Sequence, residues 1–362
     1  QLNYLPKILD LTIKENPYHY MRHSAFKGEP MTKLTDTFKI KNIEFKNRIV
    51  MPPMVCFGWA DESGIVTSKH LEHYRKRAQG QTGTIIVEAT CINENAKLRD
   101  SQIGIWNDRH LPELSKLAST IKQFGSVALI QIHHAGFKNL DENNLSKEDL
   151  RGIRKDFSSA AIRAMKAGFD GIELHGAHGY FISQMMSPIR NTRLDEYGGT
   201  LEKRFNFARE VIRDVQDKIH GDFLLGYRMG GNEPGIDEGF QIAELLKYEG
   251  IDILHVSAGI GDADKPLEIP EDFGFSSTMW LASNIKEKIK DIPIIGVGGI
   301  KTPEQALQVI ESGYCDFVAV GRALLADQDW SHGINDSKYD MKKCLNCKPC
   351  GWFKDADNCP EK

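Results

Sequence analysis

The sequence predicts a single α/β domain built as a (β/α)8 TIM barrel. Short apolar segments rich in β-branched residues alternate with longer stretches of helical spacing, which is typical of β-then-α units. Eight such units follow one another without a break in the rhythm. A doubly wound open sheet would normally carry a G-x-G-x-x-G loop after its first strand, and the sequence has neither such a loop nor a low-complexity linker. A closed parallel barrel is therefore favoured over two domains.

The predicted strands are distributed along most of the chain: Arg48–Met54, Thr84–Glu88, Val127–His133, Gly171–His175, Phe223–Met229, Ile253–Val256, Ile292–Gly296 and Phe317–Val320. Between them, helical spacing is clearest over Leu201–Ile219 and Pro303–Glu311. We expect the barrel to occupy residues 31–335 and a Cys-rich C-terminal segment to occupy residues 336–362. Residues 1–30 form an N-terminal extension of unknown role, with one short helix-like stretch over Leu5–Ile13.

Charge and composition narrow the class of partner. The net charge is −4 and there is no strong basic block, so neither nucleic acid nor a membrane surface is expected as the main partner. No apolar run is long enough to span a bilayer, and no secretory leader is visible. Of the seven cysteines, three are dispersed and four crowd the C-terminus, which is not typical of a disulfide framework. We therefore expect a small-molecule partner and a reducing, cytoplasmic location.

The end of the fourth strand carries the first candidate site, because active sites of such barrels lie at the C-terminal ends of the strands. The strand ends in His175-Gly176-Ala177-His178-Gly179-Tyr180. If the segment turns helically, the two imidazoles point the same way and could donate hydrogen bonds to one substrate oxygen. The phenol of Tyr180 could then deliver a proton. Two loop histidines without a role, or a two-ligand metal site, are the alternatives.

Glycines follow the seventh and eighth strands, in Gly296-Val297-Gly298-Gly299 and Val320-Gly321-Arg322. Loops at these two positions of a barrel often build a phosphate site from backbone amides. Glycine lets the backbone approach the phosphate closely, and Arg322 would add a charge-assisted contact. Ordinary turn glycines beside a surface arginine are the alternative, but two such loops in the two expected places predict phosphate binding.

Two further polar side chains stand near strand ends, Gln131 on the third strand and Arg228 on the fifth. An amide and a guanidinium at the barrel mouth are costly to bury without a partner. The pyrimidine edge of a flavin offers donors and acceptors to both. A structural ion pair across the barrel top, with Glu173, is the alternative, and the sequence leaves it open.

In this order along the chain, the motifs resemble the Old Yellow Enzyme family of FMN-dependent ene-reductases, from about Leu34 to Asp327. The matching stretches are Lys46–Met54, Val87–Ala89, Gln131–Gly136, the HGAHGY run, Asn191–Gly199 with Arg204-Phe205 after it, Gly296–Ile300 and Val320–Asp327. The stretches together indicate this family far more specifically than any single stretch does.

The resemblance implies a role for each candidate residue. FMN would be held by Pro53, Met54, Ala89, Gln131, Arg228, Gly298, Gly321 and Arg322. The catalytic residues would be Tyr180, His175 and His178. The two histidines would bind the electron-withdrawing oxygen of the substrate and stabilise the charge that grows on it, and the tyrosine would give the proton. NADH or NADPH would be the reductant. Relatives often pair, so a homo-oligomer is compatible with the resemblance.

The loop after the first strand departs from the family pattern. Many relatives have Cys or Thr directly after the Pro-Met pair, where the side chain tunes the flavin potential. This sequence has Val55 there, which cannot form a hydrogen bond, and Phe57 stands where some relatives have Tyr. Successive residues on a strand point to opposite faces, so Cys56 need not replace the missing group. FMN binding is expected to be retained, whereas the redox potential of the flavin and the substrate preference are left open.

The spacing Cys344-x2-Cys347-x2-Cys350-x8-Cys359 is typical of thiolate ligands to an iron–sulfur cluster or structural zinc. It is similar to a segment that holds a [4Fe–4S] cluster just after the barrel in the branch of dienoyl-CoA reductase and trimethylamine dehydrogenase. In that branch a nucleotide-binding region follows, whereas this sequence stops at Lys362, and its last gap is short for the group. A retained cluster, a zinc site and thiols without a ligand stay open, and we favour the last.

The expected function is an FMN-dependent reduction of small activated alkenes such as enones. A dienoyl-thioester reductase or an amine dehydrogenase-like enzyme with an iron–sulfur cluster is favoured by the cysteines and opposed by the paired histidines. A non-catalytic flavin-binding barrel would need neither Tyr180 nor the histidines. The sequence indicates neither the physiological substrate nor a choice between NADH and NADPH, and the loop near Gly259–Phe275 has no readable motif.

Overall fold

The computed structural model describes residues 32–136, 141–259, 267, 269–336 and 338–361. The N-terminal extension, with its helix-like stretch Leu5–Ile13, lies outside the described residues. Part of the loop near Gly259–Phe275 lies outside them as well.

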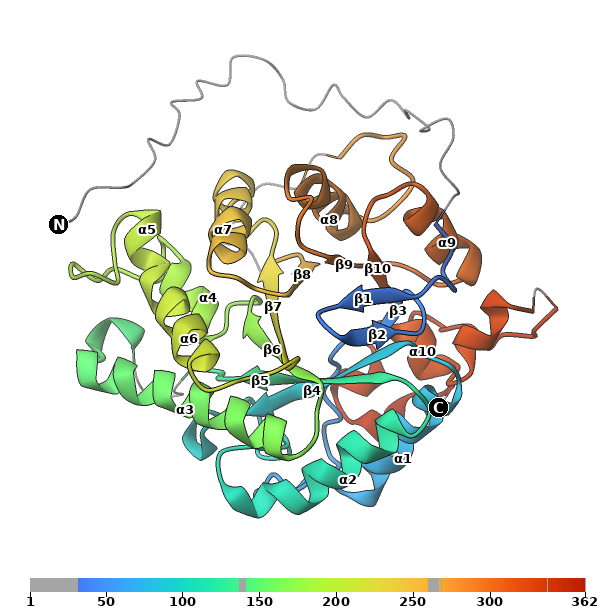
Figure 1. The fold of residues 1–362 in the computed structure, drawn as a ribbon, viewed down its shortest axis with the longest axis horizontal. Helices are drawn as coiled ribbons and strands as arrows, with labels where there is room; N and C mark the ends of the chain where they lie inside the picture. The colour runs from blue at the N-terminus through green and yellow to red at the C-terminus, as the bar shows by residue number, and fades with distance from the viewer. Residues whose placement is uncertain (1–31, 137–140, 260–266, 268, 337, 362) are drawn as a thin grey trace.

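Eight parallel strands close into a barrel in which each strand pairs with the next along the chain, and the last returns to the first. Figure 1 shows the helices arranged around the outside of this ring. The strands are β3 (Ile49–Met51), β4 (Thr84–Cys91), β5 (Val127–His133), β6 (Gly171–Gly176), β7 (Leu224–Gly230), β8 (Ile253–Ser257), β9 (Ile294–Val297) and β10 (Phe317–Ala319). The predicted (β/α)8 barrel is confirmed, and the predicted strands differ from the observed ones only at their ends.

Longer helices follow most strands and cover the outside of the barrel. They are α1 (Ser68–Gln79), α2 (Leu111–Lys122), α3 (Lys147–Lys166), α6 (Asn206–Gln216), α7 (Ile236–Tyr248), α8 (Ser277–Lys288) and α9 (Pro303–Glu311). Shorter helices are α4 (Phe181–Met186), α5 (Leu201–Arg204) and α10 (Arg322–Ala326). Among the described residues, none of these helices combines the length and the apolar character that a bilayer crossing requires.

The sequence predicts one helical stretch where the structure has two helices. The periodic pattern over Leu201–Ile219 spans both α5 and α6, which are separated by one turn residue, Phe205. At the end of α5, the buried guanidinium of Arg204 donates to the backbone oxygen of Met186 across 2.7 Å. This tertiary contact ties the end of the short helix to the end of α4, which the apolar periodicity does not reveal.

A hairpin that the sequence did not reveal closes the N-terminal end of the barrel. Its strands β1 (Phe38–Ile40) and β2 (Ile43–Phe45) pair antiparallel. Apolar side chains from the hairpin pack with inward-facing strand residues, for example against the ring of Phe317. Because this end is filled, the C-terminal end of the barrel is the one open to a ligand.

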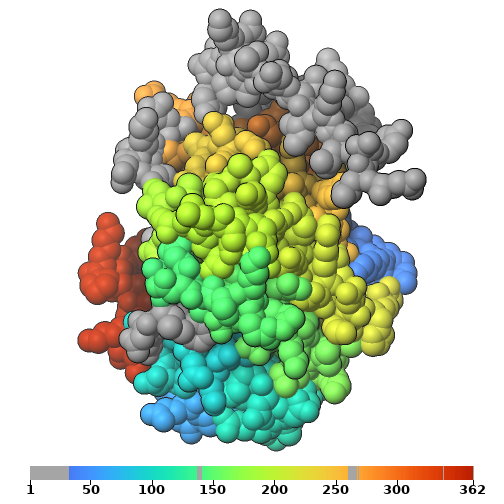
Figure 2. Space-filling view, turned by 90° about the vertical axis from the view of Figure 1, so that its left-hand side faces the viewer, coloured from blue at the N-terminus to red at the C-terminus, as the bar shows by residue number. Residues whose placement is uncertain are grey.

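The C-terminal segment packs back onto the barrel. Trp352 and Ala356 are fully buried, and the Trp352 ring meets that of Trp59 with centroids 5.6 Å apart. In Figure 2 the C-terminal residues gather at one edge of the molecule, in red. The Cys-rich segment is therefore part of the packed structure.

Candidate active site

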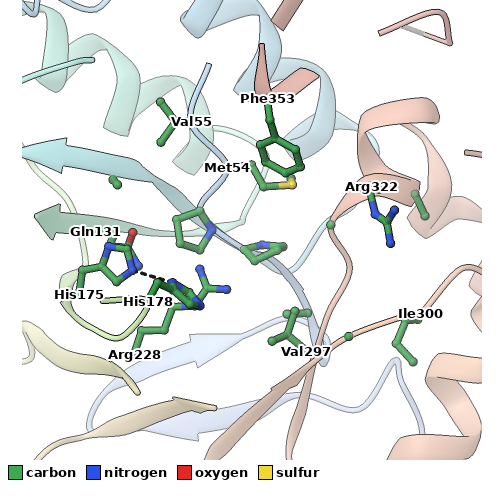
Figure 3. Close-up of a pocket in the computed structure, with 18 of the residues that line it drawn as sticks. Met54, Val55, Gln131, His175, His178, Arg228, Val297, Ile300, Arg322 and Phe353 are labelled. Atoms are coloured by element: carbon green, nitrogen blue, oxygen red, sulfur yellow. Dashed lines mark hydrogen bonds between the residues drawn. The ribbon is translucent and has the colours of Figure 1, made fainter. Parts of the chain in front are cut away.

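One cavity of about 550 Å³ opens at the C-terminal ends of the strands. Small-molecule and cofactor pockets typically measure roughly 300–1,000 Å³. Figure 3 shows the two imidazoles and Arg228 on one side of this cavity and Arg322 on the other. The cavity is lined by every residue predicted to hold the flavin or the substrate: Pro53, Met54, Ala89, Gln131, His175, His178, Tyr180, Arg228, Gly298, Gly321 and Arg322. The structure thus brings the predicted residues together, while their roles stay predictions.

The two imidazoles meet, but not on a helical turn. His175 lies at the end of β6, and the chain then turns through His178 and Gly179, whose φ angles are 65° and 70°. The segment does not turn helically, because a left-handed turn follows the strand. The rings still converge, with His175 Nε2 2.9 Å from His178 Nδ1. A left-handed φ outside glycine costs ~1–3 kcal/mol, so the surroundings must hold His178 in place.

The loop after β7 supplies that support. Glu233 accepts two backbone hydrogen bonds of 3.0 Å, at Oε2 from the N–H of His178 and at Oε1 from the N–H of Gly179. Glu233 is itself buried, so these donors stabilise its carboxylate in place of water. Sequence reasoning missed Glu233, which lies 55 positions from His178 and has no local signal.

A third imidazole and a hydroxyl extend the pair. His133, at the end of β5, places Nδ1 3.0 Å from His175 Nδ1. At the other end, His178 Nε2 lies 2.9 Å from the Oγ of Ser257, the last residue of β8. We call His133, His175, His178 and Ser257 the histidine line. Sequence reasoning missed both of its ends, although His133 lies on the same strand face as Gln131, two residues before it.

Burial keeps the imidazoles of this line neutral. It is the largest cause that lowers the pKa of His133 to about 3, that of His178 to about 2, and that of His175 well below its ordinary value. The nearby positive charge of Arg228 lowers the pKa of His175 and His178 further. A neutral imidazole has one N–H and one bare nitrogen, so each ring can donate only one hydrogen bond.

Tyr180 lies over this line, directly before α4. Its ring meets those of His133 and His175, with centroid distances of 4.5 and 4.9 Å. Burial raises the pKa of its phenol, against the opposing effect of Arg228 and Arg99. The phenol is therefore protonated at neutral pH and can donate a proton into the cavity.

A buried carboxylate orients the amide on the cavity floor. Glu173 accepts a hydrogen bond of 2.7 Å from Gln131 Nε2 and one of 2.8 Å from His255 Nδ1. The amide oxygen of Gln131 is thereby left for a ligand. Glu173 pairs with His255 and not with Arg228, so the ion pair considered from the sequence is not the one formed. Arg228 is 9% exposed, and its Nε has no hydrogen-bond partner among the described residues.

The opposite end of the cavity has the geometry of an anion site. Gly298 has a φ of 130°, and a Cβ there would lie 2.5 Å from the Oγ of Ser276, so only glycine fits. Gly321 precedes α10, whose first residue, Arg322, is exposed at the cavity edge. The backbone can therefore approach a ligand closely, and the guanidinium is accessible to an anion.

The loop after β3 presents Val55 to the cavity and turns Cys56 away from it. Cys56 is fully buried, and its backbone N–H donates to Glu88 across 2.8 Å. The phenol of Tyr74 donates to the same carboxylate, and burial raises the pKa of Glu88 to about 7. Cys56 therefore does not supply the polar group that Val55 lacks, as the alternation of side chains predicts.

The C-terminal segment forms part of the cavity wall. Phe353 and Asn346 line the cavity, and Figure 3 shows Phe353 beside Met54 and Val55. The indole of Trp352 donates to the backbone oxygen of Val55 across 3.1 Å. Sequence reasoning did not place this segment against the flavin loop.

The four C-terminal cysteines converge on a second, smaller cavity. Its lining includes Arg322 and the full predicted ligand set, Cys344, Cys347, Cys350 and Cys359. All four are free thiols. Cys344 and Arg322 also line the larger cavity, so the two sites adjoin.

The spacing of these thiols distinguishes the candidate groups. Around a zinc ion with Zn–S distances of about 2.3 Å, tetrahedral sulfurs lie roughly 3.8 Å apart. Among the described residues, no three of these sulfurs lie within 4.8 Å of one another. A [4Fe–4S] cluster takes one thiolate at each corner iron, so its sulfurs lie further apart than those around a single ion. As the structure describes them, no three of these thiols are thus arranged around one zinc ion.

The larger cavity fits FMN. The amide oxygen of Gln131 and the unpaired Nε of Arg228 match the polar edge of a flavin ring. The backbone at Gly298 and the guanidinium of Arg322 match its phosphate at the far end.

Comparison with known proteins agrees with this geometry. Residues 33–144 and 138–340 match the NADH:flavin oxidoreductase / NADH oxidase family. The chain is 36% identical over 340 residues to an NADH oxidase of Thermoanaerobacter brockii, which covers 85% of this chain and 52% of that protein. It is 37% identical over 333 residues to an NADPH dehydrogenase of Bacillus cytotoxicus, with coverage of 86% and 94%.

A solved structure shows the same fold. The Old Yellow Enzyme homologue from Zymomonas mobilis superposes with a TM-score of 0.73 at 23% identity, over 87% of this chain and 95% of that one. The chain therefore spans nearly the whole of this structure and of the Bacillus relative, but about half of the Thermoanaerobacter relative.

Proposed function

The chain belongs to the NADH:flavin oxidoreductase / NADH oxidase family, the Old Yellow Enzyme family with its FMN cofactor and NAD(P)H reductant, and we propose that it reduces the C=C bond of small activated alkenes such as enones. The observation that carries this proposal is one cavity lined by the phenol of Tyr180 and the paired imidazoles at one end and by glycine backbone with the guanidinium of Arg322 at the other.

The hydride chemistry is supplied by FMN when it is bound. Gln131 and Arg228 would hold the polar edge of the ring, and the guanidinium would stabilise negative charge there. The phosphate would be held by Gly298, Gly321 and Arg322. The remaining contacts would come from the strand ends and loops that line the cavity, at Pro53, Met54 and Ala89.

The substrate end supplies polarisation and a proton. His175 and His178 would donate hydrogen bonds to the electron-withdrawing oxygen of the substrate, where negative charge grows as the alkene is reduced. Because these rings are buried, their hydrogen bonds are stronger than they would be in water. Tyr180, held protonated, would deliver its proton to the α-carbon.

The test is enone turnover by the FMN-loaded protein. Anaerobic NADPH or NADH should bleach the flavin, and 2-cyclohexenone should restore its colour. The double variant H175A/H178A should slow the restoration by ~10²–10⁴-fold, and Tyr180→Phe by a similar factor. Tyr248→Phe, exposed on α7, is the matched control and should change nothing.

Two outcomes would overturn this assignment. Unchanged enone turnover in the double variant would remove the substrate role of the histidines. Stoichiometric FMN without NAD(P)H oxidation in the presence of any acceptor would favour the non-catalytic flavin-binding barrel.

A second proposal concerns the smaller cavity. We infer that Cys344, Cys347, Cys350 and Cys359 hold an iron–sulfur cluster, in place of the unligated thiols expected from the sequence. Support comes from the convergence of all four thiols on one cavity, while no three of these described sulfurs lie within the 4.8 Å of one another that a single ion requires. Because Cys344 also lines the larger cavity, such a centre would lie beside the flavin site. A cluster would favour the dienoyl-thioester reductase or amine dehydrogenase-like alternative.

Metal and sulfide analysis after anaerobic purification tests the cluster. About four iron atoms and four acid-labile sulfides per chain are expected for a [4Fe–4S] centre. Cys347→Ser should lower both, whereas Cys315→Ser, at a buried cysteine outside the cavity, should not. Zinc without iron, or neither metal, would contradict the proposal.

A further inference from the structure

Both ring nitrogens of each inner histidine are occupied along the histidine line. His175 contacts His133 through Nδ1 and His178 through Nε2. His178 contacts His175 through Nδ1 and Ser257 through Nε2. The inner contact, between His175 Nε2 and His178 Nδ1, needs only one proton, since one nitrogen donates and the other accepts.

A substrate oxygen changes this requirement. To receive a hydrogen bond from both rings, the oxygen must enter between His175 Nε2 and His178 Nδ1, and both of these nitrogens must then carry a proton. Two donors at about 2.8 Å from one oxygen lie roughly 4.5 Å apart, so the 2.9 Å inner contact must also open. Because the two inner nitrogens contact each other, a substrate oxygen must change both the positions of their protons and the distance between them.

His133 and Ser257, the two ends of the histidine line, determine whether both inner nitrogens can carry a proton. A neutral His175 with its proton on Nε2 has a bare Nδ1, which is satisfied only if His133 donates from its own Nδ1. A neutral His178 with its proton on Nδ1 has a bare Nε2, which is satisfied only if the hydroxyl of Ser257 donates. Each outer group therefore selects the tautomer of its neighbour.

We propose that His133 and Ser257 are positioning residues. Each donates a hydrogen bond to the outer ring nitrogen of its neighbour, so that the inner nitrogens of His175 and His178 both present a proton to the substrate oxygen. This inference rests on the proposed function, because it concerns the same oxygen. It adds two residues that never touch the substrate and yet decide how many hydrogen bonds the substrate receives.

His133 is suited to this role because nothing else fixes its tautomer. Its side chain is fully buried, and its Nε2 has no hydrogen-bond partner among the described residues. The contact at Nδ1 is therefore the one that decides where its single proton lies. The hydroxyl of Ser257 can rotate, so it can donate or accept as the line requires.

A packing role is the competing explanation, since the ring of His133 also meets that of Tyr180. Two substitutions separate the explanations. His133→Asn keeps an N–H donor near the Nδ1 position but loses the ring, whereas His133→Phe keeps a ring but loses the donor. Ser257→Thr and Ser257→Ala form the same pair at the other end.

The experiment measures binding of 4-chlorophenol to the FMN-loaded protein by calorimetry, with its phenolate oxygen standing in for the anionic substrate oxygen. His133→Phe and Ser257→Ala should each weaken binding about 10- to 100-fold, the worth of one hydrogen bond to a charged group. His133→Asn and Ser257→Thr should restore most of it. FMN content should stay at the wild-type value in all four.

Nitrogen NMR of histidine-labelled protein reads the tautomers directly. Upon addition of 4-chlorophenol, His175 should be protonated at Nε2 and His178 at Nδ1. If His133→Phe binds like the wild type while His133→Asn does not, the ring packs and the proposal is overturned. Unaltered tautomers upon ligand binding overturn it as well. A wild-type protein that takes these tautomers but never reduces an enone would instead defeat the proposed function and leave the tautomer control standing.

Discussion

The indole Nε1 of Trp352 donates to the backbone oxygen of Val55 across 3.1 Å, and this contact joins positions 297 residues apart. It ties the Cys-rich segment to the loop that lines the cavity at the position where many relatives carry the group that tunes the flavin. Together with the hydrogen bond from the N–H of Ala356 to the backbone oxygen of Phe57, it holds the C-terminal segment against the cavity wall.

Trp352→Phe should weaken FMN binding as well as the fold. The substitution keeps most of the buried ring but leaves the carbonyl of Val55 without its donor, at a cost of about 1–3 kcal/mol. Urea unfolding and FMN titration measure the two effects. Trp280→Phe, at a buried tryptophan on α8, is the control. An FMN affinity that falls no further in Trp352→Phe than in this control would show that this contact does not support FMN binding.

Glu233→Gln should raise the KM for an enone by about 10- to 100-fold. The amide removes the charge and places an N–H donor against one of the backbone N–H groups from which Glu233 now accepts, so the left-handed turn at His178 relaxes. FMN content should be unchanged, because Glu233 lies outside the flavin contacts. Steady-state kinetics measure this, with the exposed Glu244→Gln on α7 as control. Equal KM values in the two variants would show that the turn needs no carboxylate.

Arg322→Ala should reduce the affinity for FMN about tenfold and leave that for riboflavin unchanged. The exposed guanidinium would contact only the phosphate, and solvent screening limits the effect. Fluorescence titration of both flavins, with Arg151→Ala on the surface of α3 as control, measures the difference. A parallel loss for FMN and riboflavin would mean that the arginine acts on the ring or on the fold.

The burial of His134 should lower the free energy of unfolding as the pH falls. Burial lowers the pKa of His134 to about 3 from its ordinary value of 6.5. Between these values the unfolded chain binds a proton that the folded chain does not, so stability falls as the pH drops below 6.5. From pH 7.5 to 5.5 one such histidine contributes a loss of about 1.4 kcal/mol.

Urea unfolding at the two pH values measures this contribution. His134→Gln, which does not titrate, should shrink the loss by about that amount. The exposed His332→Gln is the control. The same pH dependence in His134→Gln and in the wild type would show that the loss of stability arises from another group.

Much of the barrel and its rim could be predicted from the sequence, because parallel strands in a barrel end at one rim. That rule alone selects Gln131, His175 and Arg228, which the structure brings into one cavity. The order of the motifs identified the family, which the comparisons confirm. His133 also had a signal in the sequence, since it stands two residues after Gln131 and side chains two apart on a strand share a face.

Other contacts had no signal in the sequence. Glu233 and Trp352 act on residues far along the chain, and nothing local marks a loop glutamate as the acceptor for one particular turn. The break between α5 and α6 at Phe205 is hidden because the apolar periodicity continues across it. The left-handed turn at His178 is likewise set by its partners and not by its own residue type.

The most direct test of the site is whether the cavity at the C-terminal ends of the strands binds a flavin. Protein incubated with excess FMN and then freed of unbound cofactor should retain about one FMN per chain, and its visible band should bleach under anaerobic NADH or NADPH. Colourless protein that retains no FMN would show that the strand-end residues around Arg228 and Arg322 do not form a flavin site.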